Sequence, residues 1–303
     1  MYPDIPSEDI SWPITQHAGV VEKKVIDGLL HACLLCRGEK VNAEKINGYI
    51  VDQGILTKNV RSDSNRIDAW RDYQQILSEF GLIYSTSFAK VLTLTSVAMA
   101  YLNHALTYKE LMTFQVLRYQ YPNGHKSNLS ASLVASCGDN LSIESYTEWQ
   151  TVHNVLLHPA VLVWLVLHTL WNKGQQAMLT IDEMQQYVVR CTRTDEYEQC
   201  ADAIVQSRRG EIDYLPLRRA RRNMSDWLKI LDQTLLFKLN RDKTVIAMSS
   251  YSIQEENSVL YVCKQLLEQS SYWKFQKDDA TFKQNWFKFY GDYDNNIEYV
   301  LKE

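Results

Sequence analysis

The chain has 303 residues, of which 46% are hydrophobic and 22% are charged, and its formal net charge at pH 7 is −4. This composition is typical of a globular protein with a sizeable core, and the length fits two domains or one domain with additions. The negative net charge excludes a protein coated with basic residues, so a nucleic-acid site would have to be a local patch.

Six cysteines without regular spacing do not make a disulfide framework, and Cys33 and Cys36 are expected to be buried thiols in an apolar helix. The longest apolar run, residues 160–167, is too short to cross a bilayer. The acidic, proline-containing start lacks the apolar core of a signal peptide. We therefore expect a cytoplasmic protein without membrane contact.

The first third of the chain is expected to form three helices followed by a β-hairpin. Apolar residues recur at helical spacing, Asn42 is a candidate N-cap, and Gly81 ends the third helix before an alternating stretch. The expected elements are an extended arm over residues 1–19, helices near 20–36, 43–51 and 67–80, and a hairpin over 82–95. The next region, 99–157, is expected to bridge the two halves, with helices near 107–120 and 144–157.

The second half repeats this plan. His158 and Pro159 open a strongly apolar helix, and Thr180 with Glu183 predicts a capping box at the start of the next one. The expected elements are helices over 160–171 and 181–189, an acidic helix over 195–208 within an insert at 192–216, a third helix, a hairpin ending near residue 248, and a helix over 255–268. An aromatic tail follows, and we expect it to pack onto the protein or onto a partner instead of stacking nucleic-acid bases.

The repeat is clearest where residues 72–94 align without a gap with residues 226–248. The identical pairs are Asp72/Asp226, Ile76/Ile230, Leu77/Leu231, Leu82/Leu236 and Val91/Val245. A helix followed by a two-stranded wing, used twice, predicts a mainly α fold of tandem winged-helix modules, each a helix-turn-helix plus a β-hairpin wing, joined by a helical linker. The expected domains are the arm (1–19), the first module (20–98), the bridging region (99–157), the second module (158–252), and the C-terminal helix with the aromatic tail (253–303).

Basic residues gather at the start of the third helix of the second module. A recognition helix presents its N-terminal residues to the major groove, where Arg reads guanine, Asn reads adenine and further arginines hold phosphates. The candidate DNA-binding residues are Arg218, Arg219, Arg221, Arg222, Asn223, Arg208, Arg209, Arg241 and Lys243 in the second module, and Arg61, Asn65, Arg66 and Arg71 in the first. The alternatives are a solvated basic face that balances the acidic residues at 195–202 and, for residues 240–243, a plain hairpin turn.

Enzyme chemistry finds little support. Asp4 with Glu22 and Lys24 matches the carboxylate–lysine pattern of metal-dependent nucleases, but Glu22 begins a helical run instead of lying on a strand. His168 lies in the apolar helix and is expected to be a core residue, and no phosphate-binding glycine loop occurs. The sequence therefore favours a protein with no enzyme activity, no cofactor and no metal site.

Four stretches resemble a known family. They are the run at 91–123, the apolar helix after His158 and Pro159, the run at 178–191, and the later RRARRN at 218–223 with the helix after it. All are similar to the DNA-binding region of AlwI-type (type IIS) restriction endonucleases and related bacterial phage-defence proteins. The resemblance implies sequence-specific recognition of double-stranded DNA, with cleavage supplied by a separate nuclease domain. This chain departs from that pattern because it lacks a credible nuclease motif.

We therefore expect a double-stranded DNA-binding protein or subunit of a bacterial restriction or antiviral defence system. It would work with a protein partner that carries nuclease or ATPase activity, or it would be part of a larger enzyme. The competing hypotheses are a non-enzymatic scaffold subunit of a defence complex and a nuclease with an unrecognised active site.

Overall fold

The computed structural model describes residues 2–5, 10–15, 21–55, 69–84, 89, 91–121, 123, 155–217, 220–268 and 282–303. At residues 69, 71, 72 and 282–284 the description covers the backbone only. Helices predominate in these ranges, which confirms the mainly α class predicted from the sequence. None of the described helices is long and apolar enough to cross a membrane.

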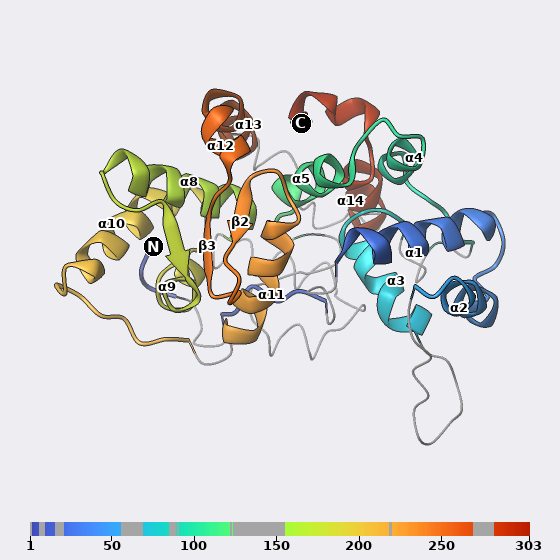
Figure 1. The fold of residues 1–303 in the computed structure, drawn as a ribbon, viewed down its shortest axis with the longest axis horizontal. Coiled ribbons are helices and arrows are strands. Elements are labelled where there is room, and N and C mark those ends of the chain that lie inside the picture. The colour runs from blue at the N-terminus through green and yellow to red at the C-terminus, as the bar shows by residue number, and fades with distance from the viewer. Residues whose placement is uncertain are drawn as a thin grey trace, which may run out of the picture.

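The helices form two groups on either side of a central helix, α5 (Figure 1). One group contains α1 (Lys23–Leu35), α2 (Ala43–Asp52), α3 (Ala69–Glu79), α4 (Ser96–Leu102) and α14 (Phe282–Tyr290), and α5 itself is Tyr108–Arg118. The other contains α8 (Pro159–Asn172), α9 (Ile181–Gln186), α10 (Tyr197–Arg208), α11 (Ala220–Asp232), α12 (Ser250–Gln254) and α13 (Glu256–Glu268). Short 3₁₀ helices in the described ranges are η2 (Val188–Arg190), η3 (Thr194–Glu196) and η5 (Asp294–Tyr299).

The second group carries a three-stranded antiparallel sheet in the order β1-β3-β2, built from β1 (Met178–Thr180), β2 (Phe237–Leu239) and β3 (Val245–Met248). The turn between β2 and β3 is held by Asn240, whose Oδ1 accepts from the backbone N of Thr244 at 2.8 Å and of Val245 at 3.0 Å. The predicted hairpin is thus confirmed. The strand β1, which precedes the Thr180 capping box, was not expected.

α11 is strongly amphipathic because its apolar residues recur every three or four positions. Met224, Trp227, Leu228 and Leu231 are all buried, and the helix packs against α9 and against the hairpin strands β2 and β3. The exposed residues of α11 are Arg221 and Arg222 in its first turn, and its other polar residues are half-buried. The packing therefore fixes α11 between a second helix and the hairpin.

The predicted repeat recurs in the backbone contacts of the two halves. Ile83 and Leu94 form an antiparallel bridge, and the aligned residues Phe237 and Met248 pair in the sheet. The likeness of the two stretches is therefore one of backbone pairing as well as of residue type.

The repeat also continues past the aligned stretch. Thr95 and Ser249 cap α4 and α12, and each side-chain oxygen accepts from the backbone N–H three residues on. The backbone N of Thr95 donates to Leu82 O at 3.1 Å, and that of Ser249 donates to Leu236 O at 2.9 Å. Neither short helix was expected from the sequence.

One expected helix is shorter in the structure. The predicted helix over 181–189 ends at Gln186, and a 3₁₀ turn follows. Tyr187, Val188 and Val189 are consecutive and fully buried. A regular helix at the surface would turn one of these three side chains toward solvent, so the backbone tightens instead.

The expected N-terminal arm is in part an internal element. All residues from 10 to 15 are buried. The Nε1 of Trp12 donates to Cys191 O at 3.3 Å, and Trp12 O accepts from Trp227 Nε1 at 3.1 Å. At the other end of the segment, Thr15 N donates to Glu79 Oε2 at 2.7 Å. The segment therefore contacts both groups of helices.

The aromatic tail packs inward where the structure describes it. Trp286, Phe287 and Tyr290 of α14 are buried, and the Tyr290 hydroxyl donates to Gln115 O in α5 at 2.7 Å. The expected packing of the tail is confirmed for these residues, and its earlier aromatics lie outside the described residues. Cys33, Cys36 and His168 are buried as predicted.

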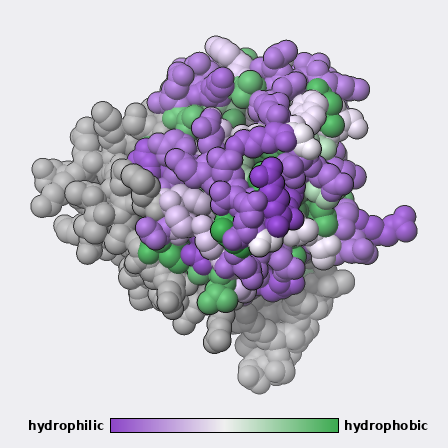
Figure 2. Space-filling view, turned by 90° about the vertical axis from the view of Figure 1, so that its left-hand side faces the viewer, coloured by the Kyte–Doolittle hydropathy of each residue, from purple (hydrophilic) through white to green (hydrophobic). Residues whose placement is uncertain are grey.

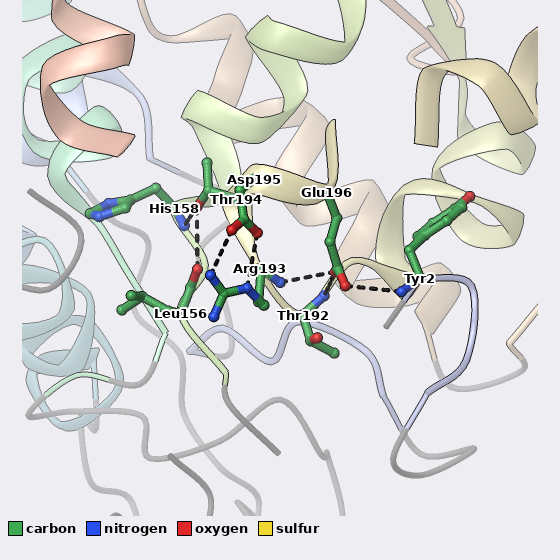
Figure 3. A network of polar contacts seen from close by, with 8 residues as sticks. All are labelled: Tyr2, Leu156, His158, Thr192, Arg193, Thr194, Asp195 and Glu196. Carbon is green, nitrogen blue, oxygen red and sulfur yellow. Dashed lines mark hydrogen bonds and ion pairs between the residues drawn. The ribbon is translucent and has the colours of Figure 1, made fainter. Parts of the chain in front are cut away.

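Figure 3 shows the polar network that joins the chain start to the region before α8. The Glu196 carboxylate accepts from the backbone N of Tyr2 at 3.0 Å and of Thr192 at 2.9 Å. Thr194 Oγ1 accepts from His158 N at 2.8 Å, which positions the residue before α8. These contacts fix the first residues of the chain, η3 and the start of α8 relative to one another.

Candidate nucleic-acid interface

The N-terminal end of α11 presents two exposed arginines, Arg221 and Arg222. Arg221 Nη1 donates to Asp182 Oδ1 at 2.7 Å and to Gln185 Oε1 at 3.3 Å, both on α9. The Arg221 and Asp182 side chains are 58% and 67% exposed, so this ion pair is a weak surface contact. Arg222 has no hydrogen-bond or ion-pair partner among the described residues.

Asn223, the predicted adenine reader, is turned toward the N-terminal segment. It is half-buried, and its Nδ2 donates to Ser11 Oγ at 3.0 Å. The amide therefore links α11 to the buried segment at residues 10–15. Its role in base reading stays a prediction.

Arg208 and Arg209 lie side by side in the sequence but in different environments. Arg208 Nε donates to Glu183 Oε1 at 2.7 Å, and its Nη2 donates to Met178 O at 2.6 Å. The Glu183 carboxylate also completes the predicted capping box with Thr180. Arg208 therefore connects α10 to β1 and to the start of α9, whereas Arg209 is exposed and unpaired among the described residues.

The tip of the β2–β3 hairpin carries Arg241 and Lys243, both exposed. Lys238 is also exposed, since the alternation of β2 buries its neighbours Phe237 and Leu239. The alternation of apolar and polar residues in the sequence could have identified Lys238. In a strand with this period-two pattern, a lysine between two apolar residues faces solvent. Lys238 was not among the predicted site residues.

The side chains of the remaining predicted site residues lie outside the described part of the structure. Arg218 and Arg219, immediately before the first described residue of α11, lie outside the described residues, as do Arg61, Asn65 and Arg66 of the first module. Arg71 lies on α3 with only its backbone described. Their predicted contacts with DNA stay predictions.

The described residues offer no cluster of three or more His, Cys, Asp and Glu side chains that could hold a metal ion. Glu22, from the nuclease-like pattern, is the residue that precedes α1, so it lies at a helix start as expected. Among the predicted site residues of the second half whose side chains the structure describes, Arg209 and Arg222, together with Arg241 and Lys243 at the hairpin tip, have no hydrogen-bond or ion-pair partner in the described part of the chain.

The comparisons with known proteins show a likeness in structure and not in sequence. No protein-family model matches the chain, and no curated protein matches it at a significant level. Among solved structures, the binding domain of BpuJ1 endonuclease, in complex with pyrene- and phenanthrene-modified DNA, superposes with a TM-score of 0.65 at 12% sequence identity. The match covers 94% of this chain and 99% of that one. The two chains share a fold.

Because the match covers nearly all of both chains, the shared fold includes both groups of helices and the elements between them. Identity of 12% leaves open which side chains the two proteins have in common. The predicted likeness to AlwI-type enzymes in particular, and the winged-helix description of each half, stay predictions.

Proposed function

We propose that this chain binds double-stranded DNA as the recognition part of a restriction or phage-defence system. The observation that carries the proposal is the setting of α11, which is held between α9 and the hairpin and presents Arg221 and Arg222 at its exposed end. The fold shared with an endonuclease binding domain solved on DNA supports the same function. The tandem winged-helix description is part of the proposal, supported by the order α8-β1-α9-α10-α11-β2-β3 in the second half, in which α10 lies within the predicted insert.

In this proposal the first turn of α11 enters the major groove. A guanidinium can donate two parallel hydrogen bonds to the O6 and N7 atoms of guanine, which suits Arg222 because its donors are unpaired among the described residues. Arg241 and Lys243 at the hairpin tip would contact phosphates beside the groove. Asp182 would release Arg221 to a phosphate at small cost, since that ion pair is exposed.

The test is binding of a labelled duplex pool of random sequence at about 50 mM and about 200 mM salt. A protein that neutralises about four phosphates should lose roughly 100-fold in affinity over this range. The variant Arg221→Ala/Arg222→Ala should bind more weakly, and its log–log salt slope should be smaller by about 1, because Arg221 is the one of the two that contacts a phosphate in this proposal. The control is Lys264→Ala/Lys288→Ala, which removes two exposed lysines from α13 and α14. Equal affinity and slope for the arginine variant and the wild type would contradict the proposal.

One observation favours the alternative role as a scaffold. A pocket of about 750 Å³ lies between α1 and α2, and the exposed apolar side chains Leu35 and Tyr49 line it. The predicted nuclease or ATPase partner stays a prediction. Co-purification of partners with the wild type, and their loss with Leu35→Asp while DNA binding is kept, would support this second role.

A further inference from the structure

The loop between α10 and α11, residues 211–217, exposes one large apolar side chain. Leu215 is 81% exposed, more than any other large apolar residue that the structure describes, and Pro216 beside it is also exposed. A single exposed leucine is common on protein surfaces and needs no explanation by itself. Leu215 differs because the backbone on both sides of it is fixed.

On the N-terminal side, the loop is held by Tyr214. Its ring lies 5.3 Å from the ring of Tyr187, and the guanidinium of Arg190 lies 5.3 Å from the Tyr214 ring centroid. The Nη2 of Arg190 also donates to the carbonyl oxygen of Leu215 at 2.8 Å. The Leu215 side chain is therefore exposed to solvent, while the backbone carbonyl of the same residue is held by Arg190.

On the C-terminal side, Leu217 is 7% exposed and its carbonyl accepts from Gln185 Nε2 at 2.9 Å. The other end of the same amide, Gln185 Oε1, accepts from Arg221 at 3.3 Å. One side chain of α9 thus connects the end of the loop to the first turn of α11. The loop that carries Leu215 is thus linked through Gln185 to Arg221, one of the two arginines that carry the proposed function.

Leu215 is an isolated apolar side chain in a polar loop, since the charged residues Glu211 and Asp213 of the same loop are also exposed. The coloured residues of the face in Figure 2 are likewise mainly hydrophilic, with hydrophobic ones scattered among them. In the major groove of DNA, the C5 methyl of thymine is the one apolar group at the base edges, and it distinguishes A·T pairs from the others. A leucine on a fixed backbone loses little conformational freedom when it meets such a group.

We propose that Leu215 contacts the C5 methyl of one thymine next to the bases that α11 reads, so that it selects a T at that position. This inference rests on the proposed function, because it requires α11 to lie in the major groove.

The test begins with selection of a preferred duplex from a random pool by the wild-type chain. Each thymine of that duplex is then replaced in turn by deoxyuridine, which lacks only the methyl group. At one position the wild type should lose roughly fourfold in affinity, the effect of one buried methyl-sized group. Leu215→Ala should bind the thymine duplex more weakly and lose nothing further with deoxyuridine at that position. Ile297→Ala, which shortens an apolar residue that is 56% exposed in η5, is the matched control and should behave as the wild type.

The outcomes separate the two proposals. Selection of a duplex together with equal deoxyuridine profiles for the wild type and Leu215→Ala overturns the thymine contact and leaves DNA binding standing. Failure of the wild type to retain any duplex overturns the proposed function and this inference with it.

Discussion

At the level of single residues, adjacent side chains of the same type have different roles. Arg208 makes an ion pair with Glu183 and donates to two backbone carbonyls, while Arg209 has no partner among the described residues. The Arg208 side chain is 22% exposed and that of Glu183 is 15% exposed, so solvent screens their interaction less than it screens a surface pair. We infer that Arg208 serves stability and that Arg209 is the one available to phosphate.

Replacing Arg208 by Met, which keeps the apolar stem, should lower the free energy of unfolding by about 2–3 kcal/mol, since it leaves Glu183 partly buried without its charged partner. Arg209→Met should change it by less than about 0.5 kcal/mol. Urea unfolding of both variants measures the difference. Equal stabilities would show that the Arg208 contacts add nothing to the fold.

His158 is a buried residue, and its burial changes the protonation equilibrium of its imidazole ring. Burial lowers the pKa of His158 from 6.5 to about 4, against the opposing effect of its hydrogen bond with Tyr119 O. Its Nδ1 lies 3.2 Å from that oxygen, whereas Nε2 has no partner among the residues that the structure describes. The folded protein therefore holds a neutral imidazole that the unfolded chain would protonate more readily.

This shift predicts a pH-dependent stability. Because the folded pKa is below the unfolded one, the contribution of neutral His158 is complete above about pH 6.5 and is lost as the pH falls toward 4. The loss should reach roughly 3 kcal/mol at the acid end. His158→Gln cannot titrate, so its unfolding free energy should fall less over the same range. Parallel pH profiles of the wild type and the variant would refute this assignment.

At the level of elements, two glycines inside neighbouring helices differ in the space around them. A Cβ added at Gly28 in α1 would lie within 2.8 Å of three carbon atoms of the Ile55 side chain. At Gly48 in α2 a Cβ would meet no atom within 4 Å. Gly28 is thus required by the close approach of residue 55, while Gly48 is not required by packing.

The two alanine substitutions should therefore have opposite signs. Gly48→Ala should stabilise the protein by up to about 1 kcal/mol, because alanine favours a helix over glycine. Gly28→Ala should destabilise it by about 1–3 kcal/mol through overpacking. In the background of Ile55→Ala the cost of Gly28→Ala should disappear, which thermal unfolding of the double variant checks. A cost that persists without the Ile55 side chain would contradict this explanation.

At the level of the whole molecule, the segment at residues 10–15 joins the two groups of helices. Trp12 is fully buried and contacts Cys191 and Trp227 in one group, and Thr15 contacts Glu79 in the other. The Tyr121 hydroxyl donates to Pro13 O at 2.6 Å between these points. The arrangement of the two halves therefore depends on a segment that precedes both of them in the sequence.

Trp12→Ala should lower the free energy of unfolding by about 3–5 kcal/mol, because it removes a fully buried indole and leaves a cavity. Leu35→Ala, at a side chain that is 59% exposed, should change it by less than about 0.5 kcal/mol. Guanidinium unfolding compares the two. A loss at Trp12 no larger than that at Leu35 would mean that the segment does not hold the halves together.

Much of the fold followed from local patterns in the sequence. The helices α1, α2, α5, α8 and α13 were predicted within a few residues, because apolar spacing and capping residues such as Asn42 act within one element. The short helices α4 and α12 were missed because a helix of so few residues has no clear apolar periodicity. Only their caps, Thr95 and Ser249, carried a signal, and the alignment of the two halves could have revealed it.

The sequence by itself determined the mainly helical class, the repeated stretch and the concentration of arginines before α11. The tertiary structure decided which of those side chains are available. Arg208 is held by Glu183, Asn223 by Ser11, and Leu215 projects from a fixed loop, each through residues distant in the sequence. Periodicity and composition describe what lies within one element, whereas a partner for a charged or polar group comes from whichever element packs beside it.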